Sequence, residues 1–213
     1  GGATNDQRVL IERYCLTSQV VTLTATGSVT NEVSCNGGTD GSASVSVSGG
    51  VSPYTYSWSD GTNVVSTAST ASTLSAGSYT VTVTDANSNT ASASVTVSQP
   101  TALSASITGT NVGCNGALTG SADLTVSGGT PGSGYTYSWS DGSSVVATTE
   151  DLTNVAAGSY TVTVTDANSC TATLSVTITE PTALSLIPAS TTHVSCNGGS
   201  DGSIDLSVTG GTS

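Results

Sequence analysis

The 213-residue chain has almost no positive charge. It contains no lysine, and its two basic residues, Arg8 and Arg13, stand against fourteen acidic residues, for a formal net charge of −12. Phosphate backbones and anionic lipid surfaces both attract clustered lysine and arginine. The composition therefore argues against nucleic acid as a partner. An acidic surface of this kind suits a protein held away from a negatively charged cell.

Further absences narrow the class of protein. Charged residues make up 8% of the chain, aromatic residues 4%, and methionine and phenylalanine do not occur. No stretch approaches the roughly 18 consecutive apolar residues of a membrane helix, so we expect no membrane insertion. Low charge with abundant glycine can indicate disorder, but the apolar residues here alternate regularly, which disordered chains do not do. We expect a folded, extracellular protein.

The sequence repeats itself with a period of about 80 residues. The same octapeptide occurs at Tyr54–Gly61 and Tyr135–Gly142, and a longer segment recurs at Gly77–Ser88 and Gly158–Ser169. Length varies only in segments rich in glycine, proline and serine, as surface loops tolerate and strands do not. Such periodicity is typical of an array of similar modules.

This register predicts the domain organisation. Residues 21–99 and 100–180 form two complete repeats, and residues 181–213 begin a third. Residues 1–20 are either the end of a preceding module or a donor strand that completes a neighbouring subunit's sheet. Because the chain stops where the first two repeats continue with a tyrosine-rich strand, we expect it to be a fragment of a longer polypeptide.

Alternating apolar and polar residues predict β-strands throughout, and no segment has helical periodicity. Outward positions are almost all serine or threonine, and the Asp-Gly pairs at Asp60 and Asp141 indicate hairpin turns. The fold class is therefore all-β, with tandem immunoglobulin-like antiparallel sandwiches. Four repeated aromatic residues are expected in the cores: Trp58, Trp139, Tyr79 and Tyr160. The alternative is that these rings form a platform that stacks on carbohydrate.

The five cysteines favour disulfides and an oxidising environment. Cys114 and Cys170 lie near the two ends of the second repeat and form one expected pair. Asn89 stands where the first repeat would have the second cysteine, so Cys35 is matched with Cys15. Buried free thiols are the alternative. Because no Cys-x-x-Cys occurs and His193 is the single histidine, a zinc site is not expected.

Catalytic patterns are missing from the sequence. One histidine cannot serve as the base for several repeats, and the acidic residues recur as isolated turn residues rather than as pairs, so no enzymatic activity is expected. Calcium is the one candidate ligand, with oxygen donors at two turns: Asp85, Asn87, Asp166 and Asn168. The alternative is that aspartate and asparagine occupy these turns because they bond to backbone groups there.

The motifs together resemble a known family. Cys-Asn-Gly-Gly-x-Asp-Gly-Ser, Pro-Tyr-Thr-Tyr-Ser-Trp and Ala-Gly-Ser-Tyr-Thr-Val-Thr-Val-Thr-Asp-Ala-Asn resemble the SprB repeat of large surface adhesins of gliding Bacteroidetes, over about residues 21–213. The tyrosine and tryptophan strand is also similar to PKD-type domains. The resemblance implies export by the type IX secretion system, display as cell-surface filaments, and adhesion to surfaces or extracellular polysaccharide during gliding motility.

The preferred interpretation is a non-enzymatic structural and adhesive protein of the cell surface, whose partners are other repeats of the same chain or neighbouring subunits. One alternative is a subunit of a self-assembling extracellular filament that exchanges strands. Another is an array of calcium-binding or carbohydrate-binding modules.

Overall fold

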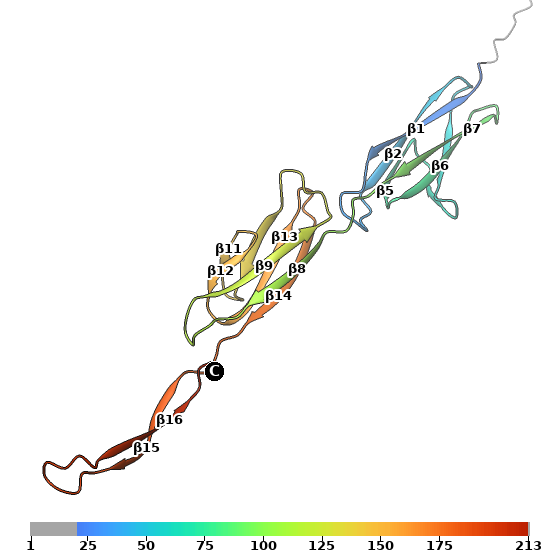
Figure 1. The fold of residues 1–213 in the computed structure, drawn as a ribbon. Helices are drawn as coiled ribbons and strands as arrows, with labels where there is room; N and C mark the ends of the chain where they lie inside the picture. Colours follow the sequence, from blue (N-terminus) through green and yellow to red (C-terminus); the bar gives the residue numbers. More distant parts are fainter. Residues whose placement is uncertain (1–20, 213) are drawn as a thin grey trace, which may run out of the picture. The chain divides into compact units, whose positions relative to one another are not determined.

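The computed structural model describes residues 21–212, and every regular element among them is a β-strand. No helix long and apolar enough to cross a membrane occurs in this part of the chain. The order of strands is the same in the first two repeats, and Figure 1 shows both repeats as groups of strands. Each repeat has a three-stranded sheet and a four-stranded sheet.

In the first repeat the two sheets have the orders β1-β2-β5 and β4-β3-β6-β7. The fourth strand of the repeat therefore pairs with the third and extends the sheet that holds the tryptophan strand. The turn at Asp60 joins these two strands, in agreement with the predicted hairpin. The strands are β1 (Thr24–Asn31), β2 (Gly41–Ser48), β3 (Thr55–Ser59), β4 (Val64–Ser66), β5 (Thr70–Leu74), β6 (Gly77–Thr84) and β7 (Thr90–Val97).

The second repeat has the corresponding orders β8-β9-β12 and β11-β10-β13-β14. Its buried residues come from both sheets and form one hydrophobic core, so the two sheets pack face to face as an immunoglobulin-like sandwich. The strands are β8 (Ser104–Thr110), β9 (Gly120–Ser127), β10 (Thr136–Ser140), β11 (Val145–Ala147), β12 (Leu152–Val155), β13 (Gly158–Thr165) and β14 (Thr171–Ile178).

Period-2 alternation accounts for this core. In β9, Ala122 and Leu124 are buried while Asp123 between them is exposed. The exposed face of the larger sheet carries hydroxyl groups instead, and Thr161 and Ser175 bond across β13 and β14 at 2.8 Å. Inward apolar residues and outward hydroxyls thus come from the same strands, as the pleat requires.

The aromatic residues that the sequence assigned to the cores are all buried. Trp58 and Trp139 are 0% exposed, and Tyr79 and Tyr160 are 5% and 7% exposed. Each polar group that these rings carry inward still needs a partner. The Trp139 indole N–H donates to the Thr149 carbonyl at 3.1 Å, and the Tyr160 hydroxyl donates to the Ala156 carbonyl at 3.1 Å. The second bond is that of a tyrosine corner.

The third repeat contributes a two-stranded hairpin of β15 (Ser185–Thr192) and β16 (Ser203–Thr209). Its apolar side chains are uncovered in this chain. Leu206, which corresponds in register to Leu124, is 53% exposed, whereas Leu124 is 3% exposed. The hairpin has the inward row of a sandwich without the opposite sheet.

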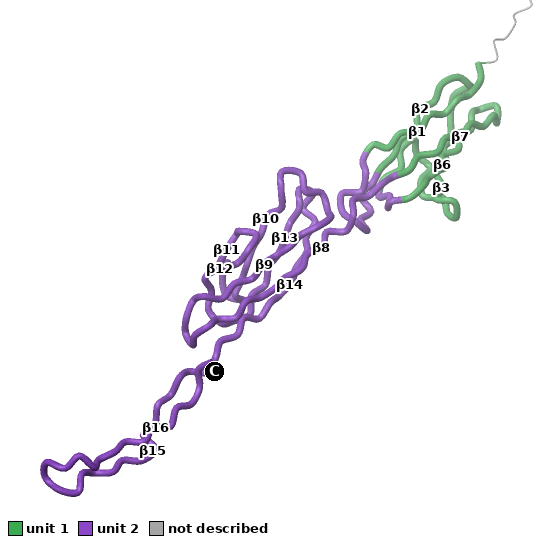
Figure 2. The backbone as a smooth tube through the Cα atoms, in the orientation of Figure 1, with its two compact units in different colours: residues 1–30, 42–72, 77–96 green, residues 31–41, 73–76, 97–213 purple. Residues whose placement is uncertain are grey.

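The described chain divides into two compact units (Figure 2). The first comprises residues up to 30, 42–72 and 77–96, and the second comprises 31–41, 73–76 and the residues from 97 onward. The loop 31–41 of the first repeat therefore groups with the second repeat. The sequence-based domain boundaries remain a prediction, and residues 1–20 lie outside the described part of the chain.

We expect Trp139→Ala to destabilise the second unit by about 3–5 kcal/mol, because a fully buried indole is replaced by a cavity. Val145→Ala is the matched control: Val145 is an apolar residue of the same sheet that is 61% exposed, and its loss should change stability by about 0.5 kcal/mol or less. Chemical denaturation measures both. Equal effects of the two substitutions would contradict the assignment of Trp139 to the core.

Candidate functional site: the disulfide-linked junction

The turn between β13 and β14 is built around a buried carboxylate. Asp166 is 6% exposed. One of its carboxylate oxygens accepts the backbone N–H groups of Asn168 and Cys170, each at 2.9 Å, and the other accepts that of Thr130 at 2.8 Å. Burial raises the pKa of this carboxyl, but the three N–H bonds outweigh burial and lower the pKa below its ordinary value.

Local sequence explains this turn. Ser169 adopts a φ of 66°, and its N–H donates to the Asp166 carbonyl at 3.1 Å, which closes the chain back toward β14. Gly129 approaches the same carboxylate so closely that a Cβ there would lie 2.6 Å from an Asp166 oxygen. Glycine is therefore required at position 129, and the turn is held against the end of β9.

The first repeat has the same turn, with one change that matters. Asp85 accepts the backbone N–H groups of Val51, Asn87 and Asn89. The side-chain amide of Asn89 donates a further bond to Asp85 at 3.0 Å, and this bond is the main reason that the Asp85 pKa lies below its ordinary value. Where the second repeat has the Cys170 sulfur, the first repeat thus has an amide that bonds within its own turn.

These bonds bear on the calcium hypothesis. The carboxylate oxygens of Asp85 and Asp166 already accept N–H donors, and the Asn168 amide donates to the Ser34 carbonyl at 2.9 Å. Among residues 21–212 no three histidine, cysteine, aspartate or glutamate side chains are grouped to hold a metal ion. The geometry favours a role of these carboxylates in holding the turns, and calcium binding stays a prediction.

Cys35 lies in the loop between β1 and β2, and hydrogen bonds hold this loop against the segment that enters the second repeat. The Asn36 amide donates to the Pro100 carbonyl at 3.0 Å, and the Gly37 N–H donates to the Gln99 side chain at 2.7 Å. The Val33 N–H donates to the Ser98 carbonyl at 3.0 Å. All of these residues belong to the second compact unit.

The structure pairs Cys35 with Cys170, which lies 135 residues later in the chain. Their Cα atoms are 5.7 Å apart, within the range that a disulfide requires. The expected pair of Cys114 with Cys170 is therefore replaced, and Cys35 has Cys170 as its partner instead of Cys15, which lies outside the described residues. Cys114 and Cys196 are exposed free thiols. The disulfide joins one sequence repeat to the next.

The two ends of the sandwich explain why Cys114 and Cys170 do not meet. Cys170 lies at the end where β8 begins, beside Ala102 and Leu103. Cys114 follows the other end of β8, whose seven residues span about 23 Å. A disulfide tolerates only about 7 Å between Cα atoms, so the two cysteines of one repeat cannot pair in the folded state.

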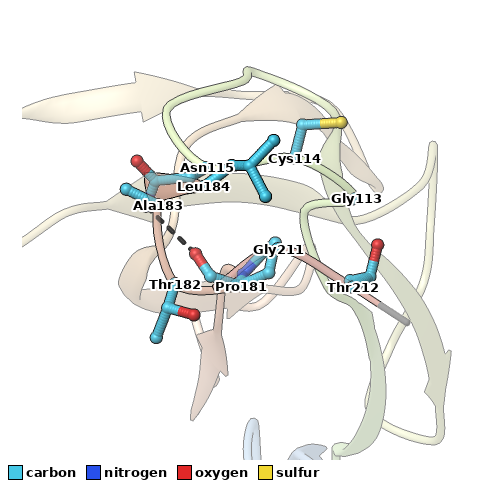
Figure 3. A pocket seen from close by; sticks show the side chains of 9 residues that line it. All are labelled: Gly113, Cys114, Asn115, Pro181, Thr182, Ala183, Leu184, Gly211 and Thr212. Atoms are coloured by element: carbon cyan, nitrogen blue, oxygen red, sulfur yellow. Dashed lines mark hydrogen bonds between the residues drawn. The ribbon is translucent and has the colours of Figure 1, made fainter. Parts of the chain in front are cut away.

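Cys114 lies at the junction between the second and third repeats, where the hydrogen bonds match those at the first junction, between the first and second repeats. The Asn115 amide donates to the Pro181 carbonyl at 3.0 Å, as Figure 3 shows, and the Val112 N–H donates to the Thr179 carbonyl at 2.9 Å. The Gly116 N–H bonds to the Glu180 carboxylate at 2.6 Å, where the first junction uses Gln99. The recurrence of Ser-Gln-Pro as Thr-Glu-Pro is the sequence signal for this contact.

The fold and this site define an all-β protein of tandem sandwich repeats in which a disulfide connects successive repeats. Three of its segments, residues 26–63, 106–144 and 189–213, match the family model described as "SprB repeat". The chain is therefore similar to the SprB repeat in three segments. Each match begins within the first strand of a repeat and includes the cysteine loop. No protein of curated function matches the chain in sequence.

Several solved structures are similar to this chain. The three N-terminal domains of the outer capsid protein Hoc of bacteriophage RB49 share 19% identity, with a TM-score of 0.44 over 91% of this chain and 70% of that one. Fibronectin(III)-like modules of CbhA from Clostridium thermocellum share 16% identity, with a TM-score of 0.31 over 71% and 92%. An intimin fragment, solved with the intimin-binding domain of its receptor Tir, shares 17% identity, with a TM-score of 0.38 over 76% and 65%.

We expect Asp166→Ala to lower the melting temperature at pH 7, because three backbone N–H groups lose their acceptor. Asp123→Ala, at an exposed position of β9, is the control. The folded-state pKa of Asp166 lies below the unfolded value of about 3.9, so its stabilisation is present above that pH and is lost as the pH falls through the folded-state pKa. The difference between wild type and Asp166→Ala should therefore narrow in acid.

The same melts separate the two interpretations of the turn carboxylates. If Asp85 and Asp166 only hold backbone groups, EDTA leaves the melting temperature of the wild-type chain unchanged. A fall in the presence of EDTA that added calcium restores would assign the carboxylates to a cation instead.

Proposed function

We propose that this chain is a load-bearing part of a non-enzymatic cell-surface protein, a run of SprB repeats that forms extracellular filaments for surface adhesion and gliding. The observation that carries the proposal is the bond between Cys35 and Cys170. A disulfide between successive repeats changes how a chain transmits force.

Force applied to the two ends of the chain travels along the shortest covalent path. That path enters at the N-terminus, leaves the backbone at Cys35, crosses the disulfide and rejoins the backbone at Cys170. The intervening residues, which include β2 to β13, lie outside the loaded path. Even if the sandwiches unfold, the disulfide keeps this part of the chain from being pulled out. Such a property suits a tether between a moving cell and a surface.

Composition supports an extracellular location. A disulfide persists in oxidising compartments, and no lysine or arginine occurs after Arg13, so trypsin-like proteases find no site within the repeats. The family match supports export by the type IX secretion system, since that is what the resemblance to gliding adhesins implies. Extracellular polysaccharide is a candidate partner, but Trp58 and Trp139 are not available to stack on a sugar because both are fully buried.

Single-molecule stretching tests the load-bearing role. We expect the oxidised chain, pulled by its ends, to reach a full extension about 450 Å shorter than the reduced chain, because 135 residues at about 3.3–3.6 Å each are excluded from the path. Cys35→Ser should behave as the reduced chain without any reductant. Cys114→Ser is the matched control and should leave the oxidised extension unchanged. Equal extensions of oxidised and reduced chains would contradict the proposal.

A second candidate function follows from the uncovered hairpin. Ile204, Leu206 and Val208 are 70%, 53% and 57% exposed, so the apolar row of β16 is open to a strand from elsewhere. In a filament subunit, residues 1–20 of another copy would supply that strand. This alternative keeps the extracellular, structural role, but the filament is then an assembly of many copies and not one continuous chain.

Deletion of residues 1–20 distinguishes a single continuous chain from a filament that is assembled by strand exchange. If strand exchange assembles the filament, the full chain forms concentration-dependent oligomers in sedimentation experiments and the deleted chain stays monomeric. If the protein is a single continuous chain, the deletion leaves the state of association unchanged, because residues 1–20 then make no contact with another copy.

A further inference from the structure

We propose that Cys114 is a covalent docking site for the β-turn of a third repeat, and that a disulfide connects a repeat to the next one wherever the next repeat has a cysteine at the end of this turn. The partner is a turn of the type Asp-Ala-Asn-Ser-Cys, as found at residues 166–170. The proposal concerns how repeats are joined, and it does not depend on what the protein adheres to.

The equivalent cysteine one repeat earlier, Cys35, is already bonded to such a turn. Cys35 and Cys114 stand in the same position of the same loop, and the loop of each is bonded to the following repeat by an equivalent set of hydrogen bonds. In the first junction the cysteine is bonded to the turn that follows β13. The equivalent donors and acceptors are Val33 and Val112, Asn36 and Asn115, Gly37 and Gly116, Pro100 and Pro181.

The structure has open space beside Cys114. A cavity of about 420 Å³ is lined by Cys114, Asn115 and Leu184 together with Gly211 and Thr212 (Figure 3). At the first junction the corresponding space is lined by Cys35, Asn36 and Leu103, and also by Ser169 and Cys170 of the turn. The cavity beside Cys114 therefore adjoins the position that a cysteine-bearing turn occupies at the other junction.

The third repeat already has the residues that hold such a turn. In the second repeat Thr130 donates its N–H to Asp166 and accepts the Ala167 N–H at 3.0 Å, while Gly129 leaves room for the carboxylate. Gly211 and Thr212 are the register equivalents of Gly129 and Thr130, and Gly211 has a positive φ of 73°, close to the 62° of Gly129. Both line the cavity at Cys114.

The first repeat shows how the series is interrupted. Asn89 occupies the position of Cys170, and its amide bonds to Asp85 within its own turn. A repeat with asparagine at this position accepts no bond from the repeat before it. The residue at the end of the turn therefore determines which junctions are covalent.

Formation of the bond is a thiol–disulfide exchange with a low-molecular-weight disulfide as the oxidant. The Cys114 thiolate attacks one sulfur of the oxidant, forms a mixed disulfide and releases one small thiolate. The thiolate of the turn then attacks the Cys114 sulfur and displaces the second small thiolate. Two protein thiols are oxidised, and one small disulfide is reduced to two thiols.

The test completes the third repeat with this chain's own sequence. Residues 131–180 are appended after Thr212, in a background of Cys15→Ser and Cys196→Ser, and the exposed Thr171 is replaced by serine in the appended copy so that its peptides differ in mass. The protein is oxidised with a glutathione buffer and digested without reduction. We expect a peptide that links Cys114 to the appended cysteine, together with the Cys35–Cys170 peptide, and loss of the reaction of Cys114 with iodoacetamide.

The matched control carries asparagine in place of the appended cysteine, as at Asn89, and Cys114 should then react fully with iodoacetamide. A second variant replaces residues 181–213 by a complete copy of residues 100–180, whose entry sequence Pro-Thr-Ala-Leu is unchanged. Protection of the copied Trp139 from quenching shows that the added repeat is folded. A folded added repeat with Cys114 still reactive, or with Cys114 bonded between two chains, would overturn the proposal.

Discussion

The junction between repeats depends on one buried carboxylate. Asp166 gathers the N–H groups of Thr130, Asn168 and Cys170, so the turn after β13 has one conformation and one position on the sandwich. Because the donors are backbone groups, the turn needs little else from the sequence than Asp, a small residue, Asn and a residue that accepts a positive φ. The carboxylate thereby places Cys170 at the end of the repeat where β8 begins, next to Cys35.

This placement gives each sandwich two chemically different ends. One end carries the loop with the Cys-Asn-Gly motif, and the other carries the turn after the sixth strand. A bond between the cysteines of one repeat would have to span the length of the strands, so Cys170 is bonded to Cys35 of the neighbouring repeat instead. The same arrangement explains why a force on the ends of the chain bypasses most of the two sandwiches.

Much of the fold could be predicted from the sequence because period-2 alternation and repeated motifs are local signals. The tryptophan strands, the tyrosine corner and the hairpin at Asp60 follow from residues near one another in the chain. The short strands β4 and β12 have no clear alternation, and Leu152, which is 1% exposed, gave no signal of its burial. The disulfide was assigned wrongly because pairing depends on which end of the sandwich each cysteine occupies. Only the strand order and the contacts of Asn36 and Gly37 with the next repeat determine that.

Mapping the disulfide in the purified chain tests most directly whether it runs between repeats. Trypsin does not cut within the repeats, so chymotrypsin would be used under non-reducing conditions, followed by mass spectrometry. We expect a linked peptide pair that contains Cys35 and Cys170, with Cys114 alkylated. A peptide that links Cys114 to Cys170 would contradict it, because the two ends of one sandwich would then have to meet.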